Sequence, residues 1–277
     1  MHASPDRKLN AASPELRFME AVCLGKAEEA ASFFRERKLV GDARPVVDVP
    51  YGRFEGLEEI RAFAEGFVSR FDAQSAFLTP VVQTVANGRV ASELVVSFVV
   101  NGEIEEVPMF VIADLRTPGL LDEVRVYCHF SFVPNLQAYR KPIFAVAHRE
   151  IGDPGLLTGA VREYYEALHH TPAADADRLC RVFGPGCKFG GYEPWDHTGG
   201  ANHGDPSTLR KSYERMATYI PRCVAIRYET IIDDGRTCVI EWVHIVSRAG
   251  REELGRVAMS GAPCKKVGVA FVLAWTG

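Results

Sequence analysis

The order of predicted elements occurs twice along the chain, and this repeat limits the folds open to it more than any other feature of the sequence. Glu93 and Glu241 each interrupt an apolar segment, and their positions differ by 148. Most of the predicted elements that follow them keep nearly the same offset. Two successive copies of one domain account for a chain of 277 residues better than one large domain does.

The first copy has the hydrophobic periodicity of two helices and a series of strands. Apolar residues at helical spacing predict helices over 14–37 and 57–71, and apolar runs predict strands over 46–49, 77–85, 90–100, 106–115 and 121–132. Asn87-Gly88 and Asn101-Gly102 are residue pairs that tight hairpin turns favour.

The second copy follows the same order, with helices predicted over 158–183 and 208–219 and strands over 187–189, 224–232, 237–247, 253–260 and 267–275. The segment between the copies is rich in turn-forming residues. We therefore expect a first domain at 14–133, a linker at 134–157 and a second domain at 158–277. The last predicted strand lacks the charges of residues 121–127, so either this strand has lost them or the C-terminal end has been altered.

The composition is that of a folded protein without a basic binding surface. Apolar residues make up 47% and charged residues 25% of the chain, and the formal net charge is −4. This balance argues against nucleic acid or an anionic membrane as a partner. No apolar run reaches the roughly 18 residues of a membrane-spanning helix, and the polar start lacks a secretory signal. Seven cysteines without a CxxC pair fit reduced thiols, and we expect a cytoplasmic protein.

One stretch of the first copy resembles a known family. Residues 48–56 read Asp-Val-Pro-Tyr-Gly-Arg-Phe-Glu-Gly and precede a helix that carries Ile60, Phe63 and Phe67, and residues 114–127 have the pattern of a closing hairpin and last strand. This order is similar to that of SnoaL-like and ketosteroid-isomerase-like proteins, which have the NTF2-like fold. The second copy follows it more loosely, through residues 189–192 and 209–219.

The resemblance implies an α+β protein made of two cone-shaped barrels, each a curved antiparallel sheet wrapped on helices. It implies that the two copies pair with each other within the chain. It also implies an apolar pocket that takes a small molecule and works without a cofactor. The fold alone does not name an activity, because it hosts isomerases, dehydratases, cyclases, epoxide hydrolases and pure binding proteins.

The candidate catalytic residues are Asp48, Glu93 and His129. The resemblance gives Asp48 the position of the family's general base, and a carboxylate in an apolar pocket can exchange protons at neutral pH. Glu93 interrupts an apolar strand, and His129 lies on the last strand of the first copy. The alternatives left open are that Asp48 caps the following turn, that Glu93 faces outward and that His129 fills the rim of the core.

The candidate ligand-binding residues are aromatic or acidic side chains expected near a pocket: Tyr51, Tyr127, Tyr164, Tyr192, Trp195 and Glu241. Glu241 shares with Glu93 the alternative of facing outward or lying at a domain contact. His197 and His203, in the long polar loop of the second copy, match no standard metal-ligand spacing, so we expect no metal site.

The resemblance stops short of a full catalytic set. Ketosteroid isomerases stabilise an enolate with a tyrosine on the first helix and a protonated acid on an inner strand. The corresponding positions here are Phe18 or Met19 and Met109, so we do not expect a true ketosteroid isomerase. The tandem polyether epoxide-opening cyclases pair an aspartate with a glutamate in each copy, and here only Asp48 with Glu93 offers such a pair.

The leading prediction is a cofactor-free acid–base enzyme of the isomerase, dehydratase or cyclase type that acts on a small apolar metabolite. The alternative is a non-catalytic protein of the NTF2-like fold that binds a small molecule or serves in assembly. The sequence leaves open the substrate, the active copy and any higher oligomer.

Overall fold

The computed structural model describes residues 13–34, 44–115 and 119–128 of the N-terminal half. In the C-terminal half it describes residues 155, 157, 159–168, 175–182, 210–211, 214, 223–235, 237–248, 251–254, 256–259, 262–265 and 267–274. The chain divides into two compact units, Met1–Arg140 and Lys141–Gly277, which we call unit 1 and unit 2. Their boundary lies within the predicted linker, and the predicted domain limits stay predictions.

The described residues of unit 1 form three helices: α1 at Pro14–Cys23, α2 at Ala27–Ser32 and α3 at Leu57–Arg70. The sequence predicted one helix over 14–37, and the structure breaks it at Gly25, which has a φ of +65°. The Gly25 N–H donates to the Val22 carbonyl and the Lys26 N–H donates to the Ala21 carbonyl. This pair of bonds is a Schellman motif, which ends α1 because glycine takes the left-handed conformation at little cost.

The sheet of unit 1 has six strands: β1 at Val46–Val49, β2 at Gly52–Glu55, β3 at Ser75–Ala86, β4 at Arg89–Val100, β5 at Glu103–Asp114 and β6 at Glu123–Cys128. Their order is β2-β1-β6-β5-β4-β3, and only the β1–β6 pair is parallel. Both predicted hairpins are confirmed, because Asn87-Gly88 and Asn101-Gly102 have positive φ at both positions, as a type I′ turn requires.

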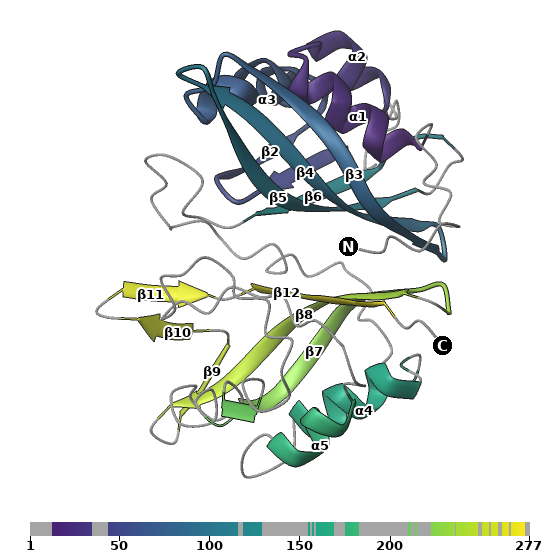
Figure 1. Cartoon of the computed structure of the whole chain (residues 1–277), viewed down its shortest axis with the longest axis vertical. Coiled ribbons are helices and arrows are strands. Elements are labelled where there is room, and N and C mark those ends of the chain that lie inside the picture. The colour runs from purple at the N-terminus through teal and green to yellow at the C-terminus, as the bar shows by residue number, and fades with distance from the viewer. Residues whose placement is uncertain are drawn as a thin grey trace. The chain divides into compact units, whose positions relative to one another are not determined.

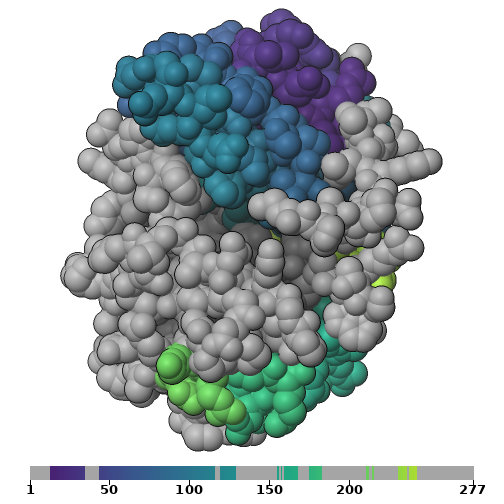
Figure 2. Space-filling view, viewed as in Figure 1, coloured from purple at the N-terminus to yellow at the C-terminus, as the bar shows by residue number. Residues whose placement is uncertain are grey.

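The three helices lie on one face of the curved sheet (Figure 1). In Figure 2 the purple surface of α1 and α2 adjoins the blue surface of the segments that follow, so helices and sheet form one packed body. We call the sheet face that carries the helices the inner face and the opposite one the outer face. Successive side chains of a strand point to opposite faces, so each strand divides between the two.

The core lies between the helices and the inner face. On β4, Leu94, Val96 and Phe98 point into it and are almost completely buried. A line of aromatic rings in contact runs through the core, formed by Phe34, Phe18, Phe63, Phe67, Phe98 and Phe71. The Phe71 and Phe98 rings are stacked with their centroids 4.2 Å apart. Each ring pair adds about 0.5–1.5 kcal/mol beyond the burial of its area.

Unit 2 contains helices α4 at Gly159–Leu168 and α5 at Ala176–Val182, and strands β7 at Cys223–Asp233, β8 at Thr237–Arg248, β9 at Arg251–Leu254, β10 at Arg256–Met259, β11 at Ala262–Lys265 and β12 at Val267–Ala274. Strands β12, β8 and β7 form an antiparallel sheet, β9 also pairs with β8, and β10 pairs with β11. The predicted strand over 253–260 falls on β9 and β10. The predicted strand over 187–189, and most of the predicted helix over 208–219, lie outside the described residues.

The long hairpins of the two units have a β-bulge at equivalent positions. In unit 1 the register shifts between Pro80 and Val82, and Val82 then pairs with Glu93. In unit 2 it shifts between Tyr228 and Thr230, and Thr230 then pairs with Glu241. The two shifts are separated by the same 148 positions as the glutamates, as two copies of one domain predict. The duplication itself stays a prediction.

None of the helices within the described ranges combines the length and apolar character that crossing a membrane requires.

The buried thiol of Cys23 predicts a pH dependence of stability. Cys23 is 4% exposed, and burial, with a further contribution from the Glu20 charge, raises the pKa of its thiol to about 12. In the unfolded chain the thiol ionises near pH 9, so above that pH the unfolded state has released a proton that the folded state keeps. The unfolding free energy therefore falls as pH rises, by about 1.4 kcal/mol per pH unit for this thiol.

We expect Cys23→Ala to reduce the slope of unfolding free energy against pH between pH 8 and 10, measured by urea unfolding followed by circular dichroism. Lost packing shifts the free energy of the variant equally at each pH, so the slope isolates the titration. Equal slopes for the variant and the natural protein would contradict the prediction.

Candidate functional site

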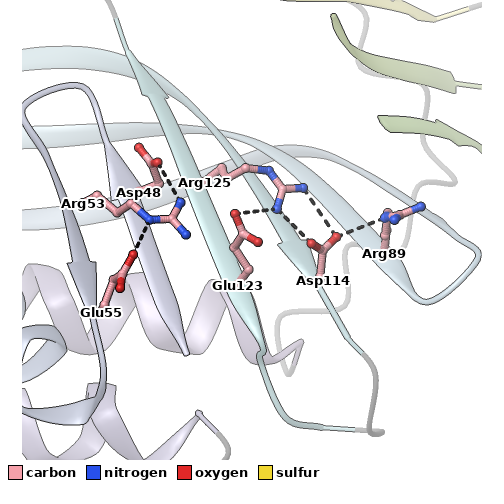
Figure 3. Close-up of polar contacts among 7 residues, drawn as sticks. All are labelled: Asp48, Arg53, Glu55, Arg89, Asp114, Glu123 and Arg125. Carbon is pink, nitrogen blue, oxygen red and sulfur yellow. Dashed lines mark hydrogen bonds and ion pairs between the residues drawn. The ribbon is translucent and has the colours of Figure 1, made fainter. Parts of the chain in front are cut away.

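Asp48 lies on the outer face of the sheet. Its neighbours on β1, Val47 and Val49, join the core, so alternation turns Asp48 to the other side. The carboxylate is 2% exposed, and its Oδ2 lies 3.4 Å from Nη1 of Arg53 on β2. Arg53 also donates from Nε to Oε1 of Glu55 at 2.7 Å (Figure 3). The sequence predicted Asp48 inside an apolar pocket, and the structure instead places it in an ion pair on the opposite face.

A second charged cluster lies on the same face, centred on Arg125 of β6. Arg125 is completely buried and donates to both carboxylate oxygens of Asp114, at 2.9 and 3.4 Å. Oε1 of Glu123 lies 3.5 Å from the same guanidinium, and Arg89 donates from Nε to Asp114 at 3.0 Å (Figure 3). Asp48 and Arg125 pair in register across β1 and β6, so the two clusters are adjacent.

These clusters are networks of ion pairs. The residues drawn in Figure 3 are four carboxylates and three guanidiniums, and buried charges of this kind are stable only when paired. Over the part of the chain that the structure describes, no group of three or more histidine, cysteine, aspartate or glutamate side chains is arranged to hold a metal ion.

Glu93 also lies on the outer face but far from Asp48. It is half-buried on β4, and β6 and β5 separate β4 from β1. The register places Asp48 level with Ala91, so three strand spacings of about 4.8 Å and two residues of about 3.3 Å along β4 put Asp48 and Glu93 about 16 Å apart. The structure does not bring this predicted acid–base pair together. Glu93 shares a row with Tyr127, because both pair in register with Phe110.

The remaining predicted residues divide between unit 2 and undescribed segments. Tyr164 on α4 is 3% exposed, and its ring lies 5.2 Å from that of Tyr165. Glu241 on β8 is completely buried. His129, Tyr192 and Trp195 lie outside the described residues, as do His197 and His203.

Tyr51 lies in the turn between β1 and β2 and packs against the core. Its ring contacts Phe54, with centroids 6.4 Å apart, and the guanidinium of Arg70 lies 4.9 Å from the ring centre. The hydroxyl oxygen of Tyr51 is buried and has no hydrogen-bond partner among the described residues. Cys128, at the end of β6, also packs against the core.

Both polar groups at this end of the core are neutral at pH 7. Burial, with a smaller contribution from Cys128, raises the pKa of Tyr51 well above its usual value, and the Arg70 charge opposes this. Burial also raises the pKa of the Cys128 thiol to about 12. The Tyr51 hydroxyl therefore keeps its proton and can donate a hydrogen bond.

The carboxylate on the inner side of the sheet is Glu15 of α1. Glu15 is completely buried, and its Oε1 accepts hydrogen bonds from Ser13 Oγ at 2.7 Å, Gln83 Nε2 at 2.5 Å and Ser92 Oγ at 2.9 Å. Its Oε2 is buried without a hydrogen-bond partner among the described residues. The β3 bulge turns Gln83 inward, because Gln83 pairs with Ser92 only after the shift of register.

Sequence reasoning missed Glu15, Arg70 and Cys128. Glu15 follows Pro14 in the first turn of a helix, where an acid is ordinary, and Arg70 is an ordinary base in a last turn. A signal was available for Cys128, because Val124 and Val126 face the core and alternation along the strand places Cys128 on the same face. Phe18 and Met19, the positions matched to the isomerase tyrosine, are fully buried in the core.

No protein-family model matches the sequence, and a search of curated proteins found no match. Solved structures do resemble it. A protein with a ketosteroid-isomerase-like fold from Catenulispora acidiphila, in complex with trimethylamine, has a TM-score of 0.36 and 15% identity over 43% of this chain and 88% of its own. An NTF2-like protein of unknown function from Cytophaga hutchinsonii has a TM-score of 0.32 and 14% identity, over 45% of this chain and 94% of its own. A protein from Kribbella flavida has a TM-score of 0.34 and 16% identity, over 44% of this chain and 91% of its own.

Unit 1 has the NTF2-like fold. The element order and sheet topology carry this statement: helices on the inner face of a curved antiparallel sheet, with β1 parallel to the last strand. The predicted α+β class is confirmed. The matches each cover less than half of this chain.

The burial of Arg125 predicts unequal costs for two substitutions at the same carboxylate. Arg125→Gln removes the fully buried partner of Asp114, and we expect it to lower the unfolding free energy by about 3 kcal/mol. Arg89→Gln removes a partly exposed partner of Asp114 and should cost less than about 1 kcal/mol. Urea unfolding at pH 7 measures both, and equal losses would contradict the ranking.

Proposed function

We propose that unit 1 binds a small, largely apolar molecule and recognises an acceptor atom on it through the Tyr51 hydroxyl. The observation that carries the proposal is that this hydroxyl is buried at one end of an aromatic core without a hydrogen-bond partner among the described residues. Leaving such a group unpaired costs about 1–3 kcal/mol, so an acceptor that reached it would be bound favourably.

The surroundings of Tyr51 support an apolar ligand. Its ring and that of Phe54 pack against the core, and Phe63 lies 5.1 Å from Phe54. Small-molecule sites combine apolar walls of this kind with few polar groups that fix orientation. The Cys128 thiol, which is also neutral, offers a weak second donor at the same place.

The position of Asp48 favours binding over the acid–base chemistry predicted for that residue. Its carboxylate lies in an ion pair with Arg53 of the neighbouring strand. The outer face also separates Asp48 from the core that an apolar ligand would contact. Binding therefore does not depend on Asp48.

A second candidate function is favoured by Glu15. This carboxylate lies on the inner side of the sheet, with one oxygen fixed by three donors and the other without a partner among the described residues. An oxygen so placed is suited to accept a proton from a bound molecule. The candidate is a cofactor-free enzyme of the isomerase type in which Glu15 takes the role that the sequence gave to Asp48.

Tyr51→Phe tests the binding function, because it removes only the hydroxyl. We expect the unliganded variant to be more stable by about 1 kcal/mol in urea unfolding, since an unpaired buried hydroxyl is lost. We expect its Kd for 2-acetylnaphthalene, which carries a carbonyl acceptor, to rise about tenfold in fluorescence titrations. The Kd for naphthalene, which has no acceptor, should not change.

The opposite signs of the two effects make this test specific. If Tyr51 had only a structural role, the natural protein and the Tyr51→Phe variant would bind each compound with the same Kd. If the hydroxyl had a hydrogen-bond partner within the protein, Tyr51→Phe would be less stable than the natural protein. Absence of saturable binding of 2-acetylnaphthalene by the natural protein would reject the binding function.

Exchange of carbon-bound protons tests the second candidate. If Glu15 is a base, the protein in D₂O should exchange the methyl protons of 2-acetylnaphthalene faster than buffer does, as followed by proton NMR. Glu15→Gln should lower this rate by at least about 100-fold, and Asp48→Asn should leave it unchanged. Exchange no faster than in buffer would reject the enzyme and leave the binding function in place.

A further inference from the structure

The guanidinium above Tyr51 has no acidic partner among the described residues. Arg70 ends α3 and lies 4.9 Å from the centre of the Tyr51 ring. Arg53, Arg89 and Arg125 of the same unit all pair with carboxylates, and no such pair is formed by Arg70 within the described ranges. One end of the core therefore has two donors, a phenol and a guanidinium, for which the described residues supply no acceptor.

We propose that the ligand of unit 1 is an anion, a carboxylate or similar planar oxyanion on an apolar body, and that Arg70 selects it. This inference rests on the proposed binding function and names its ligand class. The Tyr51 hydroxyl donates one hydrogen bond to the anion, the Arg70 guanidinium supplies the compensating charge, and the aromatic rings contact the apolar body. Arginine is suited to this role because its planar fork matches the geometry of a carboxylate.

Three further observations agree with this assignment. The Arg70 charge acts on the phenol oxygen, since it opposes the rise in the pKa of Tyr51 that burial causes. The Cys128 thiol beside Tyr51 is neutral at pH 7, so it does not repel an anion at this position. Because the Arg70 side chain is exposed, it can move to admit a ligand without disturbing the core.

A simpler role for Arg70 is to compensate the negative end of the α3 dipole, as basic residues in last turns do. That role affects the stability of the helix and has no effect on which ligand binds. Ligand selectivity therefore separates the two roles.

The experiment compares 2-naphthoate with 2-acetylnaphthalene, which share a ring system and differ in charge. We expect the natural protein to bind 2-naphthoate about tenfold more tightly at low salt, since a hydrogen bond to a charged group is the stronger one. Arg70→Gln should remove this preference and leave the Kd of the ketone unchanged. The preference should also fall when the salt concentration rises from about 20 to 500 mM, because the site is near the surface.

The chain offers a matched control in Arg17. Its guanidinium lies 5.0 Å from the centre of the Phe33 ring, so Arg17→Gln removes a similar contact above a ring that has no hydroxyl. The preference for 2-naphthoate should survive in this variant.

The failures of the two proposals are distinguishable. If the ketone binds in a Tyr51-dependent way but the natural protein has no preference for 2-naphthoate, or Arg70→Gln retains that preference, the anion inference is overturned and the binding function stands. If Arg17→Gln abolishes the preference as well, the selectivity reflects net charge and the inference is also overturned. If the ketone does not bind, the binding function and the inference both fail.

Discussion

The packing of α1 and α3 against one face of a six-stranded sheet decides on which face the polar side chains of the described strands lie. Because strand side chains alternate, each residue committed to the aromatic core turns its neighbours to the outer face. Val47 and Val49 fill the core, and Asp48 between them joins the charged clusters. The sheet face on which a residue lies therefore says more about its possible function than the type of its side chain does.

The two faces handle buried polar groups in different ways. On the outer face, Arg125 and Asp114 are compensated by direct ion pairs, which stabilise the charges but leave them little freedom to react. On the inner face, Tyr51 and Glu15 each retain one polar atom without a partner among the described residues. Unmet hydrogen-bonding capacity in a packed core lowers stability, and proteins commonly carry that cost where a ligand or a reaction supplies the missing partner.

Local sequence patterns predicted much of the fold of unit 1. Asn87-Gly88 and Asn101-Gly102 predicted both long hairpins, and the periodicity of 57–71 predicted α3 to within a residue. The break at Gly25 was missed although the glycine was visible, because apolar residues on both sides continue the helical spacing. The face of Asp48 was not predictable from β1 alone, since all four of its residues are buried and alternation of polarity gives no direction.

The site depends on contacts between distant segments. Glu15 takes two of its hydrogen-bond donors from Gln83 and Ser92, which are about 70 or more residues away in sequence and meet it across the core. No local sequence pattern predicts such a contact, because a glutamate in the first turn of a helix is usually solvated. Arg70 was hidden in the same way, as an ordinary base at the end of a helix.

The bulge in β3 links the polarity of the core to the length of the strand. One extra residue near position 81 turns Gln83 inward toward Glu15 and Val82 outward. A chain that lost one residue between Gln83 and the Asn87-Gly88 turn would instead place Val82 opposite Ser92 and present valine to the carboxylate, while its composition would hardly change. Insertion or deletion within a strand can therefore convert a polar recess into an apolar one in a single genetic step, whereas point substitutions would have to alter both side chains.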